Sequence, residues 1–378
     1  QLWQATESLA GGSQQTTLEY DARDRVTEIR RPNGTVQYGG YTDHDVPETV
    51  TLPGSGPAPA TEYTYDPAGR IGSVENEWWT LVGGAYAKTP IVGTSAAYEP
   101  NLGLKTSTSF YSHDGFGGWQ TDRTETYSYH PDTDYLTSVD YNDGLPNEVM
   151  TWSYDAAGNR ISDSANPGAW SYDDLNRMTA SPGATYFNDI LGNRLGRTAS
   201  GMSTGYGWDD VGRMTTYRPD IALNSSYYYG YRYRADGMRV EKVDSWDNQS
   251  VPVVTRFYYD AQMGIEDLET DGTNTTLRKL AIGARGIDMI AKTVNGGTEV
   301  KAFPLYDVHG NMVATLARDS GNGFTTGNVQ SYDAWGGVRS GFLRSGSADR
   351  RGRRGFVYLW KIRLHLYPRA LSGGACLR

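Results

Sequence analysis

Few residues of this 378-residue chain have the types and spacing that catalysis requires. The segment Gly201–Gly205 reads G-M-S-T-G and matches the G-x-S-x-G pattern of a nucleophilic serine. Such a serine acts from a sharp turn between a strand and a helix, with a histidine and an acid supplied from elsewhere. No helical pattern follows Gly205, so we interpret the segment as a plain loop between two hairpins.

Metal-ligating residues are present, but their spacing fits no common metal site. The five histidines form neither an H-x₃-H nor an H-E-x-x-H pattern, and they are His44, His113, His130, His309 and His365. A group of aspartates before Gly144 misses the EF-hand spacing and its distal Glu, and these are Asp132, Asp134, Asp140 and Asp143. The single cysteine, Cys376, offers no partner. We therefore expect Asp-rich turns, with no catalytic residue, metal or cofactor.

The charge and hydropathy of the chain argue against a nucleic-acid partner and against a membrane span. The net charge of −9 disfavours nucleic acid, although the arginines between Arg344 and Arg354 could contact phosphate. We interpret these arginines as a solvated or aberrant tail. No run of about 18 apolar residues occurs, so no membrane span is predicted.

The chain is organised around a repeated unit that is densest from Trp152 to Arg213. The unit reads W-S-Y-D-A-A-G-N-R-I, W-S-Y-D-D-L-N-R-M, Y-F-N-D-I-L-G-N-R-L and Y-G-W-D-D-V-G-R-M. Its aromatic anchors are taken as Tyr154, Tyr172, Phe187 and Trp208. Self-similarity at a short period is typical of repeat architectures, in which no single unit buries its own apolar face.

Each unit predicts a β-hairpin. In residues 152–154 (W-S-Y) the two rings lie on one face of a strand and the serine on the other. Asp155 is expected to accept backbone N–H groups one or two residues further on, and Gly158 can adopt the positive φ of a turn. Arg160 and Ile161 then begin the return strand. Because each aspartate recurs once per unit, we assign it a structural role in the turn.

Stacked hairpins would form a wall of aromatic rings, and the composition agrees with an all-β fold. The chain has 28 Tyr, 10 Trp and 46 Gly, residues that favour strands and turns. No stretch shows helical periodicity over three turns. The residues that define the repeat are Tyr20, Asp21, Tyr65, Asp66, Gly69, Arg70, Tyr154, Asp155, Gly158, Arg160, Tyr172, Asp173, Arg177, Asp189, Gly192, Arg194, Trp208, Asp209, Gly212, Arg213, Tyr306, Asp307, Gly310, Tyr332, Asp333 and Gly336.

The repeated Y-D-x-x-G-R/N-R units resemble YD repeats, the units of RHS (rearrangement hotspot) proteins. The block Leu305–Leu316, followed by Gly327–Gly336, resembles the start of the RHS repeat-associated core domain. The resemblance covers residues 15–340. It implies an all-β fold in which tandem hairpins form a curved, spiralling antiparallel sheet, as part of a hollow shell.

The resemblance divides the chain into five parts. Residues 1–80 are divergent YD repeats, 81–150 an irregular β region with weak repeats, and 151–300 a YD-repeat array. Residues 301–345 begin the RHS repeat-associated core, and 346–378 are an aberrant Arg-rich tail. For residues 81–128 we expect irregular strands and long loops.

The resemblance also implies a non-enzymatic function. RHS shells enclose or present a C-terminal toxin or effector domain in interbacterial competition or secretion, so the expected partners are that domain and secretion or surface components. The location implied is secreted or cell surface. An alternative is a cell-surface carbohydrate-binding or adhesion module, in which aromatic rings bind glycans. A weaker alternative is an autoproteolytic RHS core, whose family residues would lie beyond the point where the resemblance stops.

The tail departs from the family after about residue 345. The family pattern would continue with G-x-Y-G-Y and then G-L-Y-Y-x-R-A-R-Y-Y-D-P, whereas Arg350–Phe356 reads R-R-G-R-R-G-F. Asp349 is the last acidic residue. We therefore expect a truncation or a frameshift near this position, which the DNA sequence of the locus would test.

Overall fold

The computed structural model describes residues 2–9, 12–31, 34–52, 57–142, 148–219, 221, 227–245, 251–260, 263–283, 286–318, 323–327 and 329–339. Every regular element among them is a β-strand, which confirms the predicted all-β fold. In this part of the chain no helix is long and apolar enough to cross a membrane. The predictions for the tail after residue 345 lie outside the described residues.

The first sheet has 13 strands, and each strand pairs antiparallel with the next one in the sequence. Its strands are β1 (Leu2–Leu9), β2 (Gly12–Tyr20), β3 (Val26–Arg31), β4 (Gly34–Gly39), β5 (Thr49–Thr51), β6 (Ala58–Tyr65), β7 (Ile71–Val82), β8 (Ala85–Tyr98), β9 (Lys105–His113), β10 (Trp119–Tyr129), β11 (Leu136–Asn142), β12 (Glu148–Tyr154) and β13 (Arg160–Asp163).

The second sheet has 15 strands in the same sequential order, and a two-stranded sheet follows it. The strands are β14 (Ser171–Tyr172), β15 (Met178–Ser181), β16 (Ala184–Asn188), β17 (Arg194–Ala199), β18 (Met202–Trp208), β19 (Met214–Arg218), β20 (Tyr228–Tyr233), β21 (Arg239–Ser245), β22 (Val253–Asp260), β23 (Met263–Thr270), β24 (Thr275–Gly283), β25 (Gly286–Val294), β26 (Val300–Tyr306), β27 (Met312–Arg318), β28 (Phe324–Thr326), and then β29 (Ser331–Tyr332) with β30 (Val338–Arg339).

The segment 81–128 differs from the expectation of irregular strands and long loops. It holds the whole of the longest strand, β8 with 14 residues, followed by β9 and nearly all of β10. Four shifts of register interrupt the pairing of these strands, at Asn76/Glu77, Ala97/Tyr98, Thr121/Arg123 and Ser128/Tyr129. The β-bulges at these shifts break the strict alternation of side chains. A pattern search therefore misses strands that are nevertheless continuous.

The predicted subdivision at residues 80/81, 150/151 and 300/301 does not coincide with breaks in strand pairing. These positions fall inside β7, β12 and β26, each of which pairs on both sides. The subdivision stays a prediction about the density of repeats.

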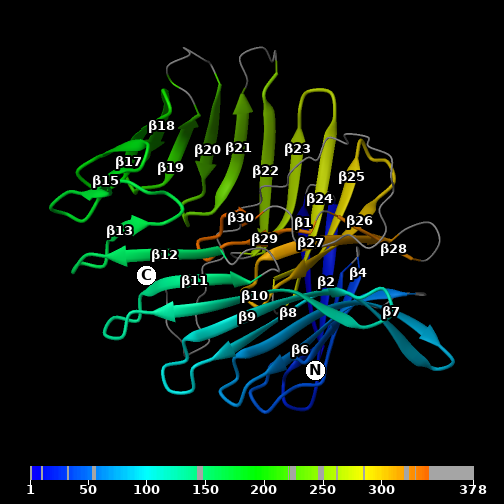
Figure 1. Ribbon diagram of the computed structural model, residues 1–378. Helices are drawn as coiled ribbons and strands as arrows, with labels where there is room; N and C mark the ends of the chain where they lie inside the picture. Colours follow the sequence, from blue (N-terminus) through cyan, green and yellow to red (C-terminus); the bar gives the residue numbers. More distant parts are fainter. Residues whose placement is uncertain are drawn as a thin grey trace, which may run out of the picture.

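The two sheets curl so that early and late strands meet. In Figure 1 the first sheet runs from blue to green below, and the second runs from green to yellow above. Arg31 at the end of β3 donates from Nη1 to the carbonyl of Ile282 in β24 at 2.7 Å. Tyr38 in β4 donates its hydroxyl to Asp288 in β25 at 3.2 Å. Strands late in the chain thus contact strands near its start. We call this contact of β3–β4 with β24–β25 the seam.

The last hairpins lie against the first sheet, inside the curl. Figure 1 shows β27–β30 in orange between the lower and the upper sheet. Asn76 in β7 donates to the carbonyl of Tyr306 at 3.0 Å, and the N–H of Val308 donates to Thr94 in β8 at 2.9 Å. Further along, the hydroxyl of Tyr141 accepts the N–H of Ala334 at 3.2 Å. The chain therefore forms a second layer against β7–β11.

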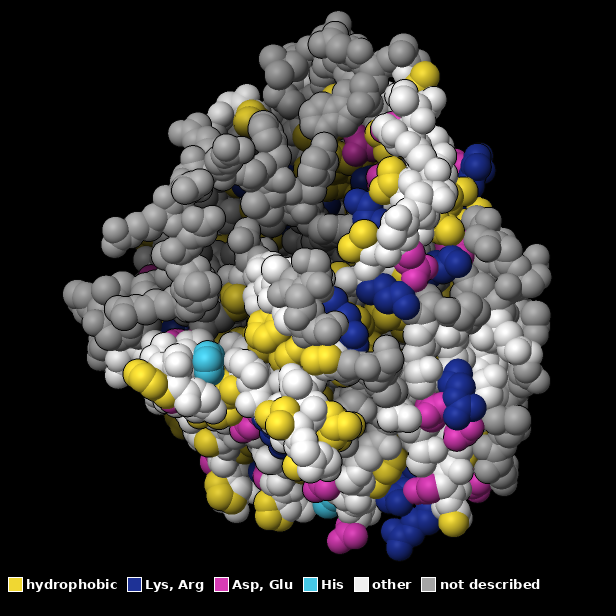
Figure 2. Space-filling model, turned by 90° about the vertical axis from the view of Figure 1, so that its right-hand side faces the viewer, with side chains coloured by type: hydrophobic (Ala, Val, Ile, Leu, Met, Phe, Trp, Pro, Cys, Tyr) yellow, Lys and Arg dark blue, Asp and Glu magenta, His cyan; other side chains and the backbone are white. Residues whose placement is uncertain are grey.

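An apolar core fills the space between these layers. Its buried residues come from β7, β8 and β24–β27, and they are Trp78, Val92, Ala281, Met289, Phe303, Leu305, Val313, Ala314 and Leu316. Seen from the side, apolar and basic side chains gather near the middle of the face in Figure 2. Burial of apolar surface is the main force that favours folding, so this core stabilises the curl.

Candidate functional site

The residues singled out in the sequence build a turn that recurs along the sheet. At Asp66, one carboxylate oxygen accepts the N–H groups of Ala68 and Arg70, each at 2.9 Å. The other oxygen accepts Nε–H of Arg70 at 2.6 Å. Two backbone bonds between Asp66 and residues 69 and 70 close the loop. The aspartate therefore binds N–H groups two and four residues on, rather than one or two.

The same arrangement recurs with either arginine or asparagine four residues after the aspartate. In every case Oδ1 accepts the two backbone N–H groups and Oδ2 accepts the side chain. The pairs are Asp21 with Arg25, Asp155 with Asn159, Asp173 with Arg177, Asp189 with Asn193, Asp209 with Arg213 and Asp307 with Asn311. At Asp333 the fourth residue is Gly337, which supplies only its N–H.

These hydrogen bonds hold the turn aspartates ionised. The backbone N–H of Arg25 and then its guanidinium lower the pKa of Asp21 to about 2. Backbone N–H groups of Arg177 and Arg213 lower the pKa of Asp173 and Asp209 in the same way. A low pKa serves a fixed acceptor and not a general acid, which agrees with a structural role.

The arginines named in the sequence fall into two positions. Arg70, Arg177 and Arg213 stand four residues after the aspartate and bind it. Arg160 and Arg194 stand five residues after it, because an asparagine takes the fourth place. Their guanidinium groups lie over aromatic rings instead, Arg160 over Trp170 at 4.4 Å and Arg194 over Tyr186 at 4.2 Å.

The turn glycines adopt the left-handed conformation that the turn requires. Their φ values run from 76° to 89°, at Gly69, Gly158, Gly192, Gly212, Gly310 and Gly336. Asn176 and Asp24 take the same place in two turns, with φ of 58° and 59°. Asparagine and aspartate tolerate this conformation better than other residues with a side chain.

In many units the tyrosine just before the turn links its hairpin to the one before it. Its hydroxyl donates to a backbone carbonyl near the start of the preceding return strand, a contact that we call the tyrosine link. The donors and acceptors, at 2.7–3.0 Å, are Tyr65 to Pro47, Tyr98 to Ile71, Tyr129 to Lys105, Tyr154 to Leu136, Tyr172 to Arg160, Tyr233 to Met214, Tyr259 to Arg239, Tyr306 to Ile287 and Tyr332 to Met312. Trp208 makes the same link from its indole N–H to Arg194 at 2.8 Å.

Burial and stacking support the tyrosine link. Burial raises the pKa of Tyr129 to about 12, so its hydroxyl stays a donor at any ordinary pH. In several units the guanidinium of the preceding turn also lies over the linking ring. These pairs are Arg25 over Tyr41, whose hydroxyl donates to the carbonyl of Val26, and Arg70 over Tyr98, both at 4.5 Å, and Arg213 over Tyr233 at 5.2 Å. One tyrosine thus binds the preceding unit through both its hydroxyl and its ring.

The choice of Phe187 as a repeat anchor is wrong. The residue directly before Asp189 is Asn188, and its side-chain amide donates to the carbonyl of Met178 at 3.1 Å. Asn188 therefore makes the link that a tyrosine makes elsewhere. Phe187 is 60% exposed. Its aromatic side chain is conspicuous in the sequence, but it stands one residue out of register, on the opposite face of the strand.

The tyrosine link also bridges the break between the two large sheets. Strands β13 and β14 do not pair with each other. Across this gap Tyr172 donates to the carbonyl of Arg160 at 2.8 Å, and Asn159 donates to Asn176 at 3.1 Å. The repeat therefore continues where the strand ladder does not.

The G-x-S-x-G segment has none of the geometry of a nucleophile. Ser200 and Gly201 form a tight turn, and Ser203 lies in β18 opposite Thr198. The hydroxyls of Ser203 and Thr198 are 3.2 Å apart. A strand follows the turn where a nucleophile would require a helix.

Among the residues that the structure describes, one group of carboxylates lies close enough to hold a metal ion. The ligand atoms of Glu62, Glu75 and Glu77 lie within 4.8 Å of one another. Lys88 contacts Glu62 at 2.5 Å, and the indole N–H of Trp79 donates to Glu77 at 2.7 Å. The ammonium group of Lys88 and the indole of Trp79 thus already bind two of these three carboxylates.

The comparisons with known proteins agree with the repeated turn. A family profile described as RHS Repeat matches residues 4–36. This match and the recurring turn support the assignment of the chain to the RHS/YD-repeat proteins. The tRNA3(Ser)-specific nuclease WapA of Bacillus spizizenii is 27% identical over 194 residues, which is 50% of this chain and 8% of that protein. The chain therefore spans less than a tenth of the length of this curated relative.

Solved structures show weaker likeness to this RHS-repeat chain. The crystal structure of TcdB2-TccC3-Cdc42 has a TM-score of 0.36 at 10% identity, over 89% of this chain and 24% of that one. The crystal structure of TcdB2-TccC3 has a TM-score of 0.31 at 13% identity, over 89% and 23%. A porin-like protein from Bacteroides uniformis has a TM-score of 0.25 at 10% identity, over 67% and 92%.

Proposed function

We propose that this RHS-repeat chain is a wall segment that encloses or presents a C-terminal toxin or effector domain. The protein that carries it would be secreted or displayed at the cell surface and would act in interbacterial competition. The wall itself performs no catalysis. The observation that carries the proposal is the curl of the sheet, which brings β3–β4 to β24–β25 and places β26–β30 on the inner side.

The construction of the repeat supports a structural role for its chemistry-bearing residues. Turn aspartates are occupied by backbone N–H groups and by the residue four positions on. The linking tyrosines donate their hydroxyls to the chain itself. A glycan-binding face would need such rings and hydroxyls to be open to a sugar. Autoproteolysis would depend on residues beyond 339, which lie outside the described part.

The relative's name supports the proposal from another direction. The relative is named as a nuclease, and this chain matches 8% of its length. A matched segment that covers so small a share of a nuclease fits a carrier for an activity located elsewhere in the protein. We therefore place the effector outside the described residues.

A passenger experiment tests enclosure. A small folded reporter is fused after Arg378 in one protein and before Gln1 in another, and its half-life in proteinase K is measured. We expect a longer half-life for the reporter after Arg378, because the last hairpins lie inside the curl. Met289→Asp places a charge in the core beside the seam and should abolish the difference. Equal half-lives at both ends would refute enclosure.

A further inference from the structure

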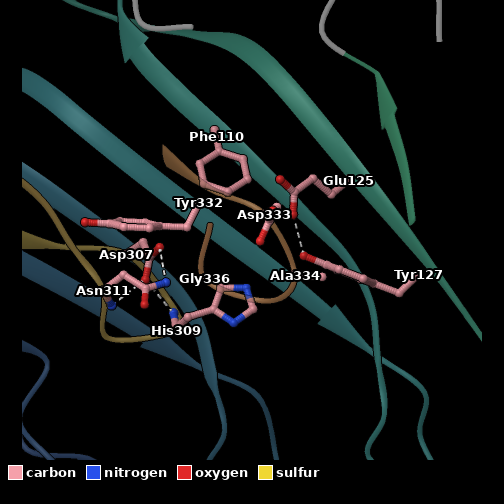
Figure 3. A pocket seen from close by; sticks show the side chains of 10 residues that line it. All are labelled: Phe110, Glu125, Tyr127, Asp307, His309, Asn311, Tyr332, Asp333, Ala334 and Gly336. Carbon is pink, nitrogen blue, oxygen red and sulfur yellow. Dashed lines mark hydrogen bonds between the residues drawn. The ribbon is translucent and has the colours of Figure 1, made fainter. Parts of the chain in front are cut away.

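A small polar cavity lies between the first sheet and the second layer. Its volume is about 140 Å³, and its walls include Phe110, Glu125, Tyr127, Asp307, His309 and Asp333. Figure 3 shows the carboxylates of Glu125 and Asp333 turned toward the same space, with Asp307 and His309 across from them. The cavity lies between strands β9 and β10 and two turns that come about 200 residues later in the chain. Its walls therefore meet only when the chain is folded.

One side of the cavity is held rigidly by a buried ion pair. Glu125 is 2% exposed, and one of its oxygens lies 2.8 Å from Nη2 of Arg123. Its other oxygen accepts the hydroxyl of Tyr127 at 2.6 Å. Arg123 also donates to Ser331 at 3.0 Å and lies over the ring of Phe110 at 4.1 Å. The two charges therefore face each other as an ion pair, although Nε of Arg123 has no hydrogen-bond partner among the described residues, and the pair forms one wall of the cavity.

Asp333 is the exception among the turn aspartates around this cavity. Its Oδ1 accepts the N–H groups of Trp335 at 2.9 Å and Gly337 at 2.7 Å, as in other turns. In the turns of Asp21, Asp66 and Asp307, for example, an arginine or asparagine four residues on binds Oδ2, whereas the turn of Asp114 also has a glycine, Gly118, at this place. Here that residue is glycine, and among the described residues no side chain donates to Oδ2 of Asp333. One carboxylate oxygen at the cavity is thus left without its usual donor.

The cations nearby are committed to other groups. Lys105 lies with Nζ 3.1 and 3.2 Å from the two ring nitrogens of His309. Burial lowers the pKa of Lys105 to about 8 and that of His309 to about 4, so His309 is neutral at pH 7. Asp307 is bound by Asn311 through both its backbone and its side chain. Asp333 is the carboxylate that a ligand can reach as an acceptor.

We propose that this cavity is a binding site for a guanidinium group. The repeat supplies the template, because Arg25, Arg177 and Arg213 each donate Nε–H to Oδ2 of their turn aspartate at 2.7 Å. A ligand guanidinium, approaching from the cavity, supplies to Oδ2 of Asp333 the donor that Gly337 cannot supply. The cavity has the space of about four or five water molecules at roughly 30 Å³ each, which is enough for this flat group.

The binding of the group follows from its charge and its donors. A guanidinium offers N–H groups in a flat fork that suits a carboxylate, and the bond is charge-assisted. The site does not depend on the enclosing role of the wall. The group can come from a free small molecule or from an arginine side chain of a peptide, and the two sources share this chemistry.

Calorimetric titration of the full chain tests the site. The probes are methylguanidinium for a free molecule and a short unstructured peptide with one arginine for a side chain. Methylurea, which has the same shape and no charge, is the control ligand. Asp333→Asn keeps the Oδ1 acceptor of the turn and removes the charge. Asp114→Asn is the matched control, because Asp114 forms the same turn with Gly118 and lies outside the cavity.

We expect methylguanidinium to bind and methylurea not to bind. Asp333→Asn should weaken binding about tenfold or more, as the loss of one charge-assisted hydrogen bond predicts, and Asp114→Asn should leave it unchanged. Binding of the peptide as well would assign the site to arginine side chains, and its absence would assign it to free molecules. Absence of methylguanidinium binding, or equal binding by Asp333→Asn and the unmodified protein, would overturn the proposal. Circular dichroism confirms that each variant is folded.

Discussion

The tyrosine link at the break between the sheets can be tested by removing one oxygen atom. Tyr172→Phe keeps the ring and deletes the hydroxyl that donates to the carbonyl of Arg160 at 2.8 Å. Because β13 and β14 share no strand pairing, this bond has few neighbours that could replace it. A partly buried neutral hydrogen bond contributes about 1 kcal/mol net. At 25 °C that corresponds to about a fivefold change in the local opening equilibrium.

Hydrogen exchange followed by mass spectrometry measures this local opening. Repeat arrays are stabilised mainly by contacts between neighbouring units, so the loss should stay local. We expect amides of β14 and β15 to exchange about fivefold faster in Tyr172→Phe, with no change in β6 and β7.

The matched control is Tyr154→Phe, which removes the equivalent bond to Leu136. There, β11 and β12 stay paired from Ser138–Thr151 to Tyr141–Glu148 and limit the opening. A smaller local effect is expected than in Tyr172→Phe. A uniform rise of exchange along the whole chain, or no change at β14, would refute the role of the link.

Three further predictions concern the turn. Asp66→Ala should lower the urea midpoint by an amount equivalent to about 1–2 kcal/mol, whereas Asp66→Asn should retain most stability because its amide oxygen still accepts both N–H groups; equal loss in the two variants would contradict this. The pKa of Asp21 is about 2 in the fold against 3.8 for an unperturbed aspartate, so its contribution is complete above pH 3.8 and lost as the pH falls through about 2. Thermal midpoints should therefore fall steeply between pH 4 and pH 2, and a flat profile there would count against the turn bonds. Gly310→Ala should cost about 1 kcal/mol at its φ of 79°, and Gly310→Asn less, because Asn176 adopts a similar φ in its own turn; equal urea midpoints for the two would refute the conformational argument.

The hairpin array could be predicted from the sequence because its information is local. Alternating aromatic residues, an aspartate and a glycine within one unit specify a strand, a turn and a return strand. The aspartate's partners lie within four residues, so its structural role follows from spacing alone. The same reasoning fails at Phe187, because an amide at Asn188 replaces the tyrosine and looks unremarkable in the sequence.

The tyrosine link and the cavity could not be predicted, because both depend on how units stack. The acceptor of Tyr154 is a backbone carbonyl, which no residue type marks. Arg123 and Ser331 are 208 residues apart in sequence and meet only when the sheet curls. The missing partner of Asp333 is visible in the sequence as Gly337, but its significance needs the geometry of the other turns.

The curl of the sheet is the central claim, and a cysteine pair across the seam tests it most directly. A methyl-sized atom on Gly34 of β4 would lie 2.8 Å from the end of the Met289 side chain in β25. In a Cys376→Ser background, Gly34→Cys with Met289→Cys should be joined within one chain by a short bis-thiol reagent, as read by mass spectrometry. Gly34→Cys with Val211→Cys, whose site is 71% exposed in the turn before β19, is the control pair and should not be joined. An intrachain product for the first pair alone is the result that the curl predicts; no product, or equal yields from both pairs, would contradict it.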